Sequence, residues 1–206
     1  GVRLVRASRG AAELPRLIGL GKEVEMEPKA LLVIDMLNDF MDPHGALYCG
    51  DRSREIIPVI QSLVQRFREE NHPVIFLRDA HRPDDLEFGR FPAHAVKGTW
   101  GSEIIPELQP PPGSLVIDKT RFSGFHATNL AEVLADIRPE EVWVVGVVTS
   151  ICVMDTAGGL VDRDYRVVIP VDAVADFDSE SERFALQRME RVYKVRLIHH
   201  DHAVPA

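Results

Sequence analysis

Short apolar runs alternate along the chain with segments in which apolar residues recur every three or four positions. The runs are rich in Val, Ile and Leu and contain few polar residues, which is typical of strands buried on both faces of a sheet. We predict six strands, at residues 30–35, 74–79, 114–119, 142–147, 167–171 and 196–199.

Four helices are predicted between and after these strands. The first two follow from apolar stripes with helical spacing, which contain Ile56, Ile60, Leu63, Val64 and Phe67 and then Leu130, Val133, Leu134 and Ile137. A third helix should follow Cys152, and a fourth should open at Ser179, which has the spacing of a capping box with Glu182. Strands that alternate with helices predict an α/β fold: a single domain with a six-stranded parallel sheet and helices on both faces, in a Rossmann-like three-layer arrangement.

Length, composition and charge limit the classes of function. A chain of 206 residues with 45% hydrophobic residues fits one domain. The net charge of -8 argues against a nucleic-acid partner, and no apolar run approaches the roughly 20 residues that span a membrane. Only two cysteines occur, Cys49 and Cys152, so we expect free thiols in a reducing cytoplasm. Residues 1–28 are interpreted as an N-terminal arm before a domain at 29–206.

Four reactive side chains lie at or just beyond the carboxyl ends of predicted strands. Asp35 ends the first strand, Asp79 the second and Lys119 the third, and Cys152 follows the fourth strand after a short turn. In open parallel sheets the ligand crevice lies outside these strand ends. We therefore expect the four side chains to converge at one edge of the sheet.

Cys152, Asp35 and Lys119 together have the chemistry of amide hydrolysis. A cysteine at the start of a helix and beside a lysine is expected to have a lowered pKa, which favours the attacking thiolate. Asp35 would act as the base and Lys119 as the cation. Each residue also has a structural interpretation: a buried core cysteine, an aspartate that caps a turn and a solvated lysine.

Three segments resemble the isochorismatase-like cysteine hydrolases: residues 33–40 (VIDMLNDF), 118–125 (DKTRFSGF) and 146–153 (GVVTSICV). The resemblance implies a catalytic Asp35, Lys119 and Cys152. It also implies a non-proline cis peptide bond before Val148, with the backbone N–H groups of Val148 and Cys152 forming an oxyanion hole. If Asp35 and Lys119 act only on the thiolate, Asp35→Asn and Lys119→Ala should lower turnover with little loss of stability.

A narrower resemblance, to the nicotinamidases, rests on Asp79-Ala80-His81 followed by residues 91–99 (FPAHAVKGT). It implies one divalent transition metal, held by Asp79, His81 and His94, and such ligands suit zinc, iron or manganese. Some nicotinamidases place a fourth ligand between these motifs, and we expect Glu87 in that position. Asp84 and Asp85 compete for it, but they follow Pro83 closely and are expected to lie in a turn.

The same resemblance places Phe40 and Phe91 on the two faces of the substrate ring, with Phe122 nearby. Flat apolar walls select flat aromatic amides. All three could instead be ordinary core residues. The chain departs from the nicotinamidase pattern at Ala80, where Trp or Phe is frequent, at Phe91, where Trp is frequent, and at Val148, where Ala is frequent.

The resemblance to the nicotinamidases implies an enzyme that converts nicotinamide to nicotinic acid and ammonia through a Cys152 thioester, acts also on pyrazinamide and serves NAD salvage. One alternative is another amidase of the same superfamily, acting on a carbamoyl or ureido compound. Another is a non-catalytic module that binds a metal or ligand. We expect a small aromatic amide as partner, no nucleic acid, no membrane, and a homo-oligomer by family analogy. The histidines in residues 199–202 are interpreted as an exposed tail.

Overall fold

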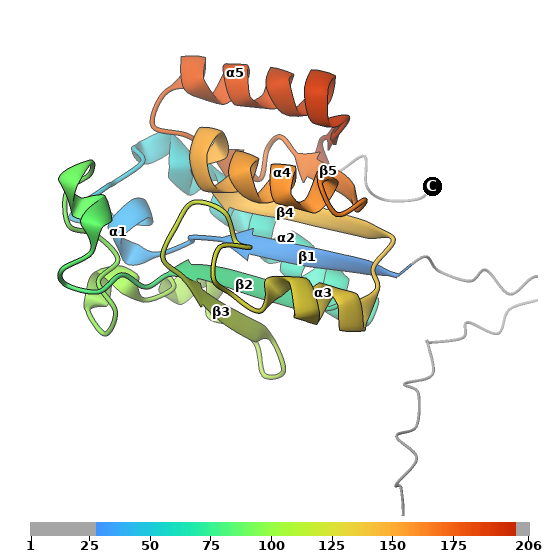
Figure 1. The fold of residues 1–206 in the computed structure, drawn as a ribbon, viewed down its shortest axis with the longest axis horizontal. Helices are drawn as coiled ribbons and strands as arrows, with labels where there is room; N and C mark the ends of the chain where they lie inside the picture. Colours follow the sequence, from blue (N-terminus) through green and yellow to red (C-terminus); the bar gives the residue numbers. More distant parts are fainter. Residues whose placement is uncertain (1–27, 201–206) are drawn as a thin grey trace, which may run out of the picture.

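A parallel β-sheet runs through the middle of the computed structural model, which describes residues 28–200. Six strands lie side by side in the order β3-β2-β1-β4-β5-β7 (Figure 1). In chain order they are β1 Lys29–Ile34, β2 Val74–Asp79, β3 Leu115–Lys119, β4 Glu141–Val147, β5 Arg166–Pro170 and β7 Arg196–Ile198. All six predicted strands are present, with each end shifted by no more than one residue.

A seventh strand was not predicted. β6, Val174–Ala175, pairs in parallel with β4, where Gly146 lies opposite Val174 and Val147 opposite Ala175. Two residues are too short for an apolar run to indicate a strand. The sheet is therefore seven-stranded, with six strands in sequence across it and β6 beside β4.

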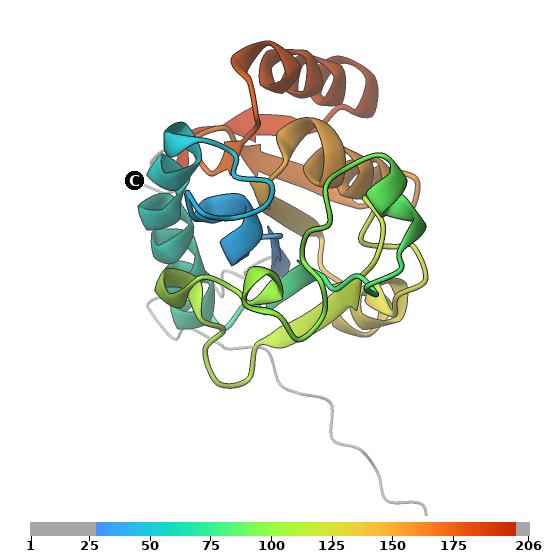
Figure 2. The same cartoon turned by 90° about the vertical axis from the view of Figure 1, so that its left-hand side faces the viewer.

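Helices cover both faces of the sheet, as the alternating pattern predicts (Figures 1 and 2). They are α1 Asn38–Met41, α2 Ile56–Glu69, α3 Leu130–Ile137, α4 Met154–Val161 and α5 Ser179–Arg188. Leu31 and Val33 of β1 point into the core beneath α2, whereas Leu32 and Ile34 belong to the core beneath α3 and α4. Because successive side chains of a strand point to opposite faces, the unbroken apolar run of β1 serves both cores.

Short turns of tighter or wider helix connect these elements. They are the 3-10 turns η1 Asp51–Glu55, η2 Leu86–Gly89, η3 Trp100–Ser102 and η4 Pro106–Leu108, and the π-helical turns η5 Thr149–Val153 and η6 Met189–Tyr193. Among residues 28–200, no helix is long and apolar enough to cross a membrane. The predicted arm, apart from residue 28, lies outside the described residues.

The start of α5 differs from the predicted capping box. Asp178, not Ser179, is the N-cap, and its carboxylate accepts the backbone N–H groups of Glu180 at 3.0 Å and Ser181 at 2.9 Å. Glu182 instead forms an ion pair of 2.7 Å with Arg52. The helix begins where we predicted, but a different side chain satisfies its first donors.

We expect Gly146→Ala to destabilise the fold by about 3 kcal/mol, because an alanine here is strained and overpacked. Gly146 has φ 113°, and a Cβ atom at this position would lie 2.1 Å from the backbone oxygen of Ile34 in β1. Urea unfolding measures the change. Gly89→Ala is the control, since a Cβ atom there meets nothing within 4 Å. Equal stability of the two variants would contradict the predicted clash.

Candidate active site and metal site

Asp35, Lys119 and Cys152 meet at the carboxyl edge of the sheet. Asp35 follows β1, Lys119 is the last residue of β3, and Cys152 lies in the π-helical turn after β4. The Lys119 Nζ lies 2.7 Å from Asp35 Oδ2 and donates to Cys152 Sγ at 3.5 Å. All three residues are buried. The structure therefore brings together the three residues for which the sequence suggests catalysis.

Lys119 also joins this cluster to Asp79. Its Nζ donates to Asp79 Oδ1 at 2.6 Å, and Asp35 Oδ1 accepts the backbone N–H of Asp79 at 2.8 Å. Burial alone would lower the pKa of Lys119, but the negative charges of Asp35 and Asp79 raise it well above its usual value. Lys119 is therefore an ammonium that serves two carboxylates.

The pKa values of Cys152 and Asp35 indicate how the thiol would be activated. Burial raises the pKa of Cys152 well above its usual value; Lys119 lowers it, whereas Asp35 and Asp79 raise it further. The expectation of a lowered thiol pKa is therefore wrong for this state of the protein. Burial and then the charge of Asp79 raise the pKa of Asp35 to about 6, against the effect of Lys119. A neutral thiol thus lies beside a carboxyl group tuned to exchange a proton near neutral pH.

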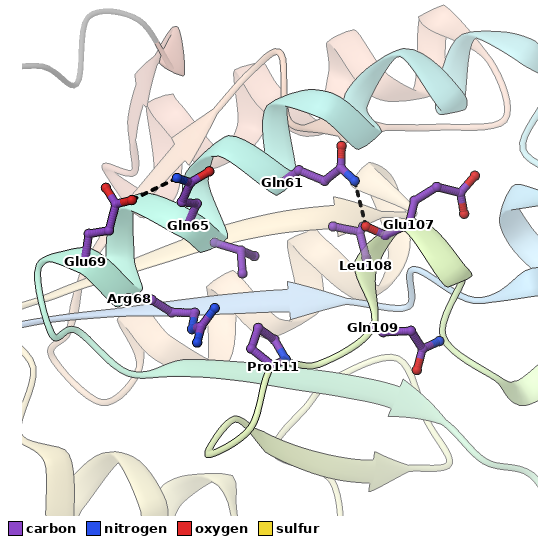
Figure 3. Close-up of a pocket in the computed structure, with 9 residues that line it drawn as sticks. Gln61, Gln65, Arg68, Glu69, Glu107, Leu108, Gln109 and Pro111 are labelled. Carbon is purple, nitrogen blue, oxygen red and sulfur yellow. Dashed lines mark hydrogen bonds between the residues drawn. The ribbon is translucent and has the colours of Figure 1, made fainter.

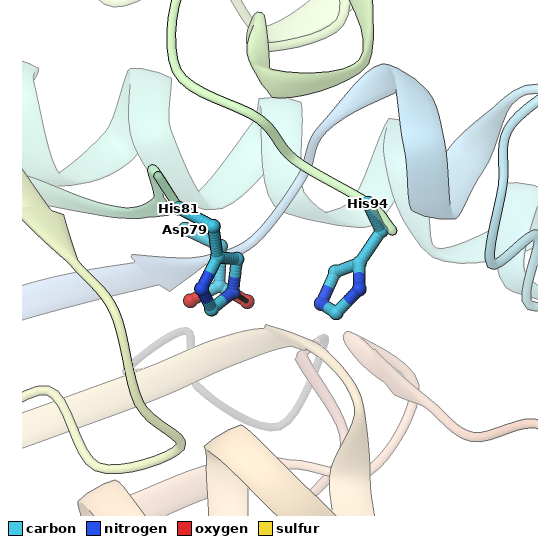
Figure 4. A group of neighbouring side chains, drawn as sticks. All are labelled: Asp79, His81 and His94. Atoms are coloured by element: carbon cyan, nitrogen blue, oxygen red, sulfur yellow. Dashed lines mark ion pairs between the residues drawn. The ribbon is translucent and has the colours of Figure 1, made fainter. Parts of the chain in front are cut away.

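Asp79, His81 and His94 form a second buried cluster (Figure 4). One ligand atom from each lies within 4.8 Å of the other two. His81 Nε2 is 3.6 Å from Asp79 Oδ2 and, although buried, has no hydrogen-bond partner. His94 Nδ1 lies 2.8 Å from the backbone oxygen of Pro92, which leaves Nε2 to face the cluster.

Glu87 adds a second carboxylate to this group. Its Oε1 lies 4.0 Å from Nε2 of both His81 and His94. Its Oε2 is buried without a hydrogen-bond partner, but it lies 3.8 Å from the Arg121 guanidinium and 3.9 Å from that of Arg90. Buried polar atoms are rarely left unpaired, and imidazole nitrogens with carboxylate oxygens are the ligands of a divalent transition metal. The unpartnered Nε2 of His81 and the donor set therefore fit such an ion.

The two competitors of Glu87 lie elsewhere. Asp84 is exposed and forms an ion pair of 2.9 Å with Arg82. Asp85 Oδ2 lies 3.2 Å from Nδ1 of His81, the ring nitrogen that does not face Asp79. Neither aspartate belongs to the group of Asp79, His81 and His94.

A narrow cavity lies over both clusters. Phe40, Phe91 and Phe122 line it, together with Asp79, Glu87, His94, Val148, Cys152, Leu47, Ile151 and Phe177. Its volume of about 20 Å³ holds little more than one water molecule. Phe177, 41% exposed, is the most exposed residue of the cavity wall.

Phe177, Leu47 and Ile151 were not predicted as cavity residues. Phe177 and Leu47 lie outside the recognised motifs, whereas Ile151 lies within residues 146–153, and the positions of all three depend on contacts between distant segments. Asp176 illustrates such a contact: it accepts the backbone N–H of Ser150 at 2.6 Å and that of Phe177 at 2.8 Å. The buried aspartate between two apolar residues was the one available signal.

The backbone near Cys152 has the feature that the family resemblance implies. The peptide bond between Val147 and Val148 is cis. Val148 and Cys152 both line the cavity. Their N–H groups remain predicted oxyanion donors.

Two other places in the fold do not resemble catalytic sites. A groove of about 530 Å³ lies between α2 and residues 107–111 (Figure 3). There Gln61 donates to the Glu107 backbone oxygen at 2.7 Å and Gln65 to Glu69 at 2.8 Å, so these amides are satisfied. In the tail, His200 Nδ1 lies 2.5 Å from Asp172, while residues 201–206 lie outside the described part.

Known proteins share this sequence pattern and fold. The isochorismatase domain model matches residues 29–199. A nicotinamidase from Bacillus subtilis is 34% identical with a TM-score of 0.79, over 83% of this chain and 99% of that one. A pyrazinamidase from Pyrococcus horikoshii in complex with zinc is 30% identical with a TM-score of 0.78, over 83% and 98%. An N-carbamoylsarcosine amidase from Thermoplasma acidophilum is 33% identical with a TM-score of 0.77, over 84% and 97%.

The burial of Lys119 changes the stability expected of its variants. In Lys119→Met, Asp35 and Asp79 would remain buried without their cation, so we expect a loss of about 3–5 kcal/mol in the free energy of unfolding. Lys97→Met is the matched control, because the Lys97 side chain is 68% exposed and pairs with Asp118 at the surface; its loss should stay below about 1 kcal/mol. Urea unfolding of both variants at neutral pH decides, and similar losses would contradict the role given to the buried ammonium.

Proposed function

The chain belongs to the isochorismatase family, and from this premise we propose that it is a nicotinamidase, which hydrolyses nicotinamide to nicotinic acid and ammonia and also accepts pyrazinamide. The observation that carries the proposal is the Lys119 ammonium. It contacts Asp35 and Cys152 on one side and Asp79 of the histidine cluster on the other. A nucleophile and a fitting metal site thus share one narrow, phenylalanine-lined cavity.

In the proposed reaction Cys152 is the nucleophile and Asp35 the proton carrier. Asp35 takes the thiol proton as Sγ attacks the carboxamide carbon, and the N–H groups of Val148 and Cys152 stabilise the oxyanion. Asp35 then gives the proton to the leaving nitrogen, the C–N bond breaks and ammonia departs. Asp35 next takes a proton from water, whose oxygen attacks the thioester carbon. The C–S bond breaks, nicotinic acid is released and the proton returns to Sγ.

Asp79, His81, His94 and Glu87 would hold the metal ion. When bound, a divalent ion supplies a Lewis acid that can hold a pyridine nitrogen or a water molecule. Zinc is the first choice for these ligands, with iron or manganese as alternatives because Glu87 makes the site more anionic. Lys119 keeps one oxygen of Asp79 occupied, so the other oxygen is the one directed at His81.

The second candidate is an amidase for carbamoyl or ureido compounds, favoured by the similarity to N-carbamoylsarcosine amidase. The nitrogen and oxygen donors beside the cavity support nicotinamide, because a carbamoyl substrate without a ring nitrogen has no use for a metal at that place. A non-catalytic binding module would not require Cys152 beside a carboxyl group with a pKa of about 6. We place the activity in cytoplasmic NAD salvage.

We expect Cys152→Ala to lower ammonia release from nicotinamide by about 10⁴-fold or more, because no other group can form the thioester. Cys49→Ala is the control: Cys49 is also buried, but burial and then the nearby carboxylates raise its pKa to about 12, and it lies outside the cavity. Ammonia is measured with nicotinamide and with N-carbamoylsarcosine. Activity retained in Cys152→Ala would refute the mechanism, and a preference for N-carbamoylsarcosine in the wild type would refute the proposed substrate.

The rate should also depend on the protonation of Asp35. Only the carboxylate form can take the thiol proton, so kcat/KM should fall as the pH drops below about 6, the pKa of Asp35, and approach a plateau above it. Bound zinc is measured at each pH, so that loss of metal is separated from loss of the base. In Asp35→Asn the rate should be low at every pH, and a wild-type profile that is flat from about pH 5 to 8 with metal retained would contradict this role.

A further inference from the structure

The two ring nitrogens of His81 face different carboxylates. Nε2 lies 3.6 Å from Asp79 Oδ2 and 4.0 Å from Glu87 Oε1, on the side of the proposed metal site. Nδ1 lies 3.2 Å from Asp85 Oδ2. A carboxylate can only accept a hydrogen bond, so this contact has Nδ1–H as the donor, and in the neutral imidazole Nε2 then carries the lone pair.

Asp85 is itself held firmly. It caps the 3-10 turn η2, and its Oδ1 accepts the backbone N–H of Glu87 at 2.9 Å. The Arg121 guanidinium donates to Oδ1 at 3.0 Å and to Oδ2 at 3.2 Å. The Asp85 side chain is only 7% exposed. One carboxylate therefore fixes the imidazole of His81 and the backbone of Glu87 at the same time.

We propose that Asp85 is a positioning residue that holds His81 Nε2 and the Glu87 carboxylate toward a divalent metal ion, without binding the ion itself. The proposal rests on the metal site of the proposed function. A carboxylate that accepts a hydrogen bond from a metal-binding imidazole fixes the orientation of the ring and makes its other nitrogen a stronger ligand. The capping bond adds to this, because it sets the point from which Glu87 reaches the histidines.

Arg121 completes the arrangement. Besides Asp85, its guanidinium lies 3.8 Å from Glu87 Oε2, so it offsets the charge of two neighbouring carboxylates. The residue lies two positions after Lys119, on the segment that leaves β3. The end of β3 thus supports the proposed catalytic cluster through Lys119, and the segment that follows it supports the proposed metal site through Arg121.

Zinc affinity tests the proposal without reference to activity. Zinc is titrated into metal-free protein in competition with a chromophoric chelator, for the wild type, Asp85→Ala, Asp85→Asn and the control Asp84→Ala. We expect Asp85→Ala to weaken zinc binding by about 10- to 100-fold. Asp85→Asn, whose amide oxygen can still accept from Nδ1–H, should lose less. Asp84→Ala should match the wild type, because Asp84 is exposed and contacts only the neighbouring Arg82 and its own loop.

A second measurement reports on the ring directly. Long-range ¹H–¹⁵N spectra of histidine side chains in metal-free protein, with His81 identified by His81→Gln, should show Nδ1 protonated in the wild type and mixed tautomers in Asp85→Ala. If Asp85→Ala does not fold, Asp85→Leu, which is similar in shape and has no acceptor, carries both measurements. Unchanged zinc affinity and an unchanged tautomer in the folded variant would overturn the role of Asp85 alone. A wild type that binds no zinc would overturn the metal site of the proposed function and this proposal with it.

Discussion

A single buried ammonium between two carboxylates is the interaction on which the candidate site depends. Lys119 ends β3, and the parallel register places it opposite Asp79 at the end of β2, while Asp35 follows β1 on the other side of β2. Three adjacent strands therefore deliver the three charges to one point. Without Lys119 the two carboxylates would remain buried and uncompensated, and without the carboxylates Lys119 would. Either change would lower the free energy of unfolding by far more than a surface ion pair could contribute. The arrangement of these charges therefore depends on the order of the strands in the sheet.

The excess of negative charge at this edge of the sheet affects both the Cys152 thiol and the donors of the proposed metal site. Asp35, Asp79 and Glu87 are buried acids, and Lys119 is the one buried amine among them. In such surroundings burial and excess negative charge keep a thiol protonated, which is why the pKa of Cys152 is raised and not lowered. The same excess suits a divalent cation at the unpaired donors. Burial and the surplus of carboxylates thus account for the raised pKa of Asp35, and the same surplus favours a cation at the proposed metal site.

Much of this was predictable from the sequence, because strand ends can be read from apolar runs. Asp35, Asp79 and Lys119 each terminate such a run, and parallel strands bring their ends together. The rest depends on loops whose paths no local pattern encodes. Phe177 reaches the cavity from a segment after the two-residue strand β6, and Asp85 differs from the neighbouring Asp84 only in the direction that its side chain takes. Spacing identified both aspartates as candidates but could not distinguish them.

Three buried or nearly buried aspartates fix the loops around the cavity by accepting backbone N–H groups. Asp39 accepts the N–H groups of Ala46 and Ala95. Asp85 accepts that of Glu87, and Asp176 accepts those of Ser150 and Phe177. These loops carry Glu87 and His94 of the proposed metal site, the turn that holds Cys152, and part of the cavity wall. In each bond the donor is a backbone N–H, which does not depend on the side chain of its residue. The side chains of the cavity wall can therefore change while the loops keep their paths. A division between fixed backbone and variable wall permits proteins of one fold to take different substrates, and the similar structures include a nicotinamidase and an N-carbamoylsarcosine amidase.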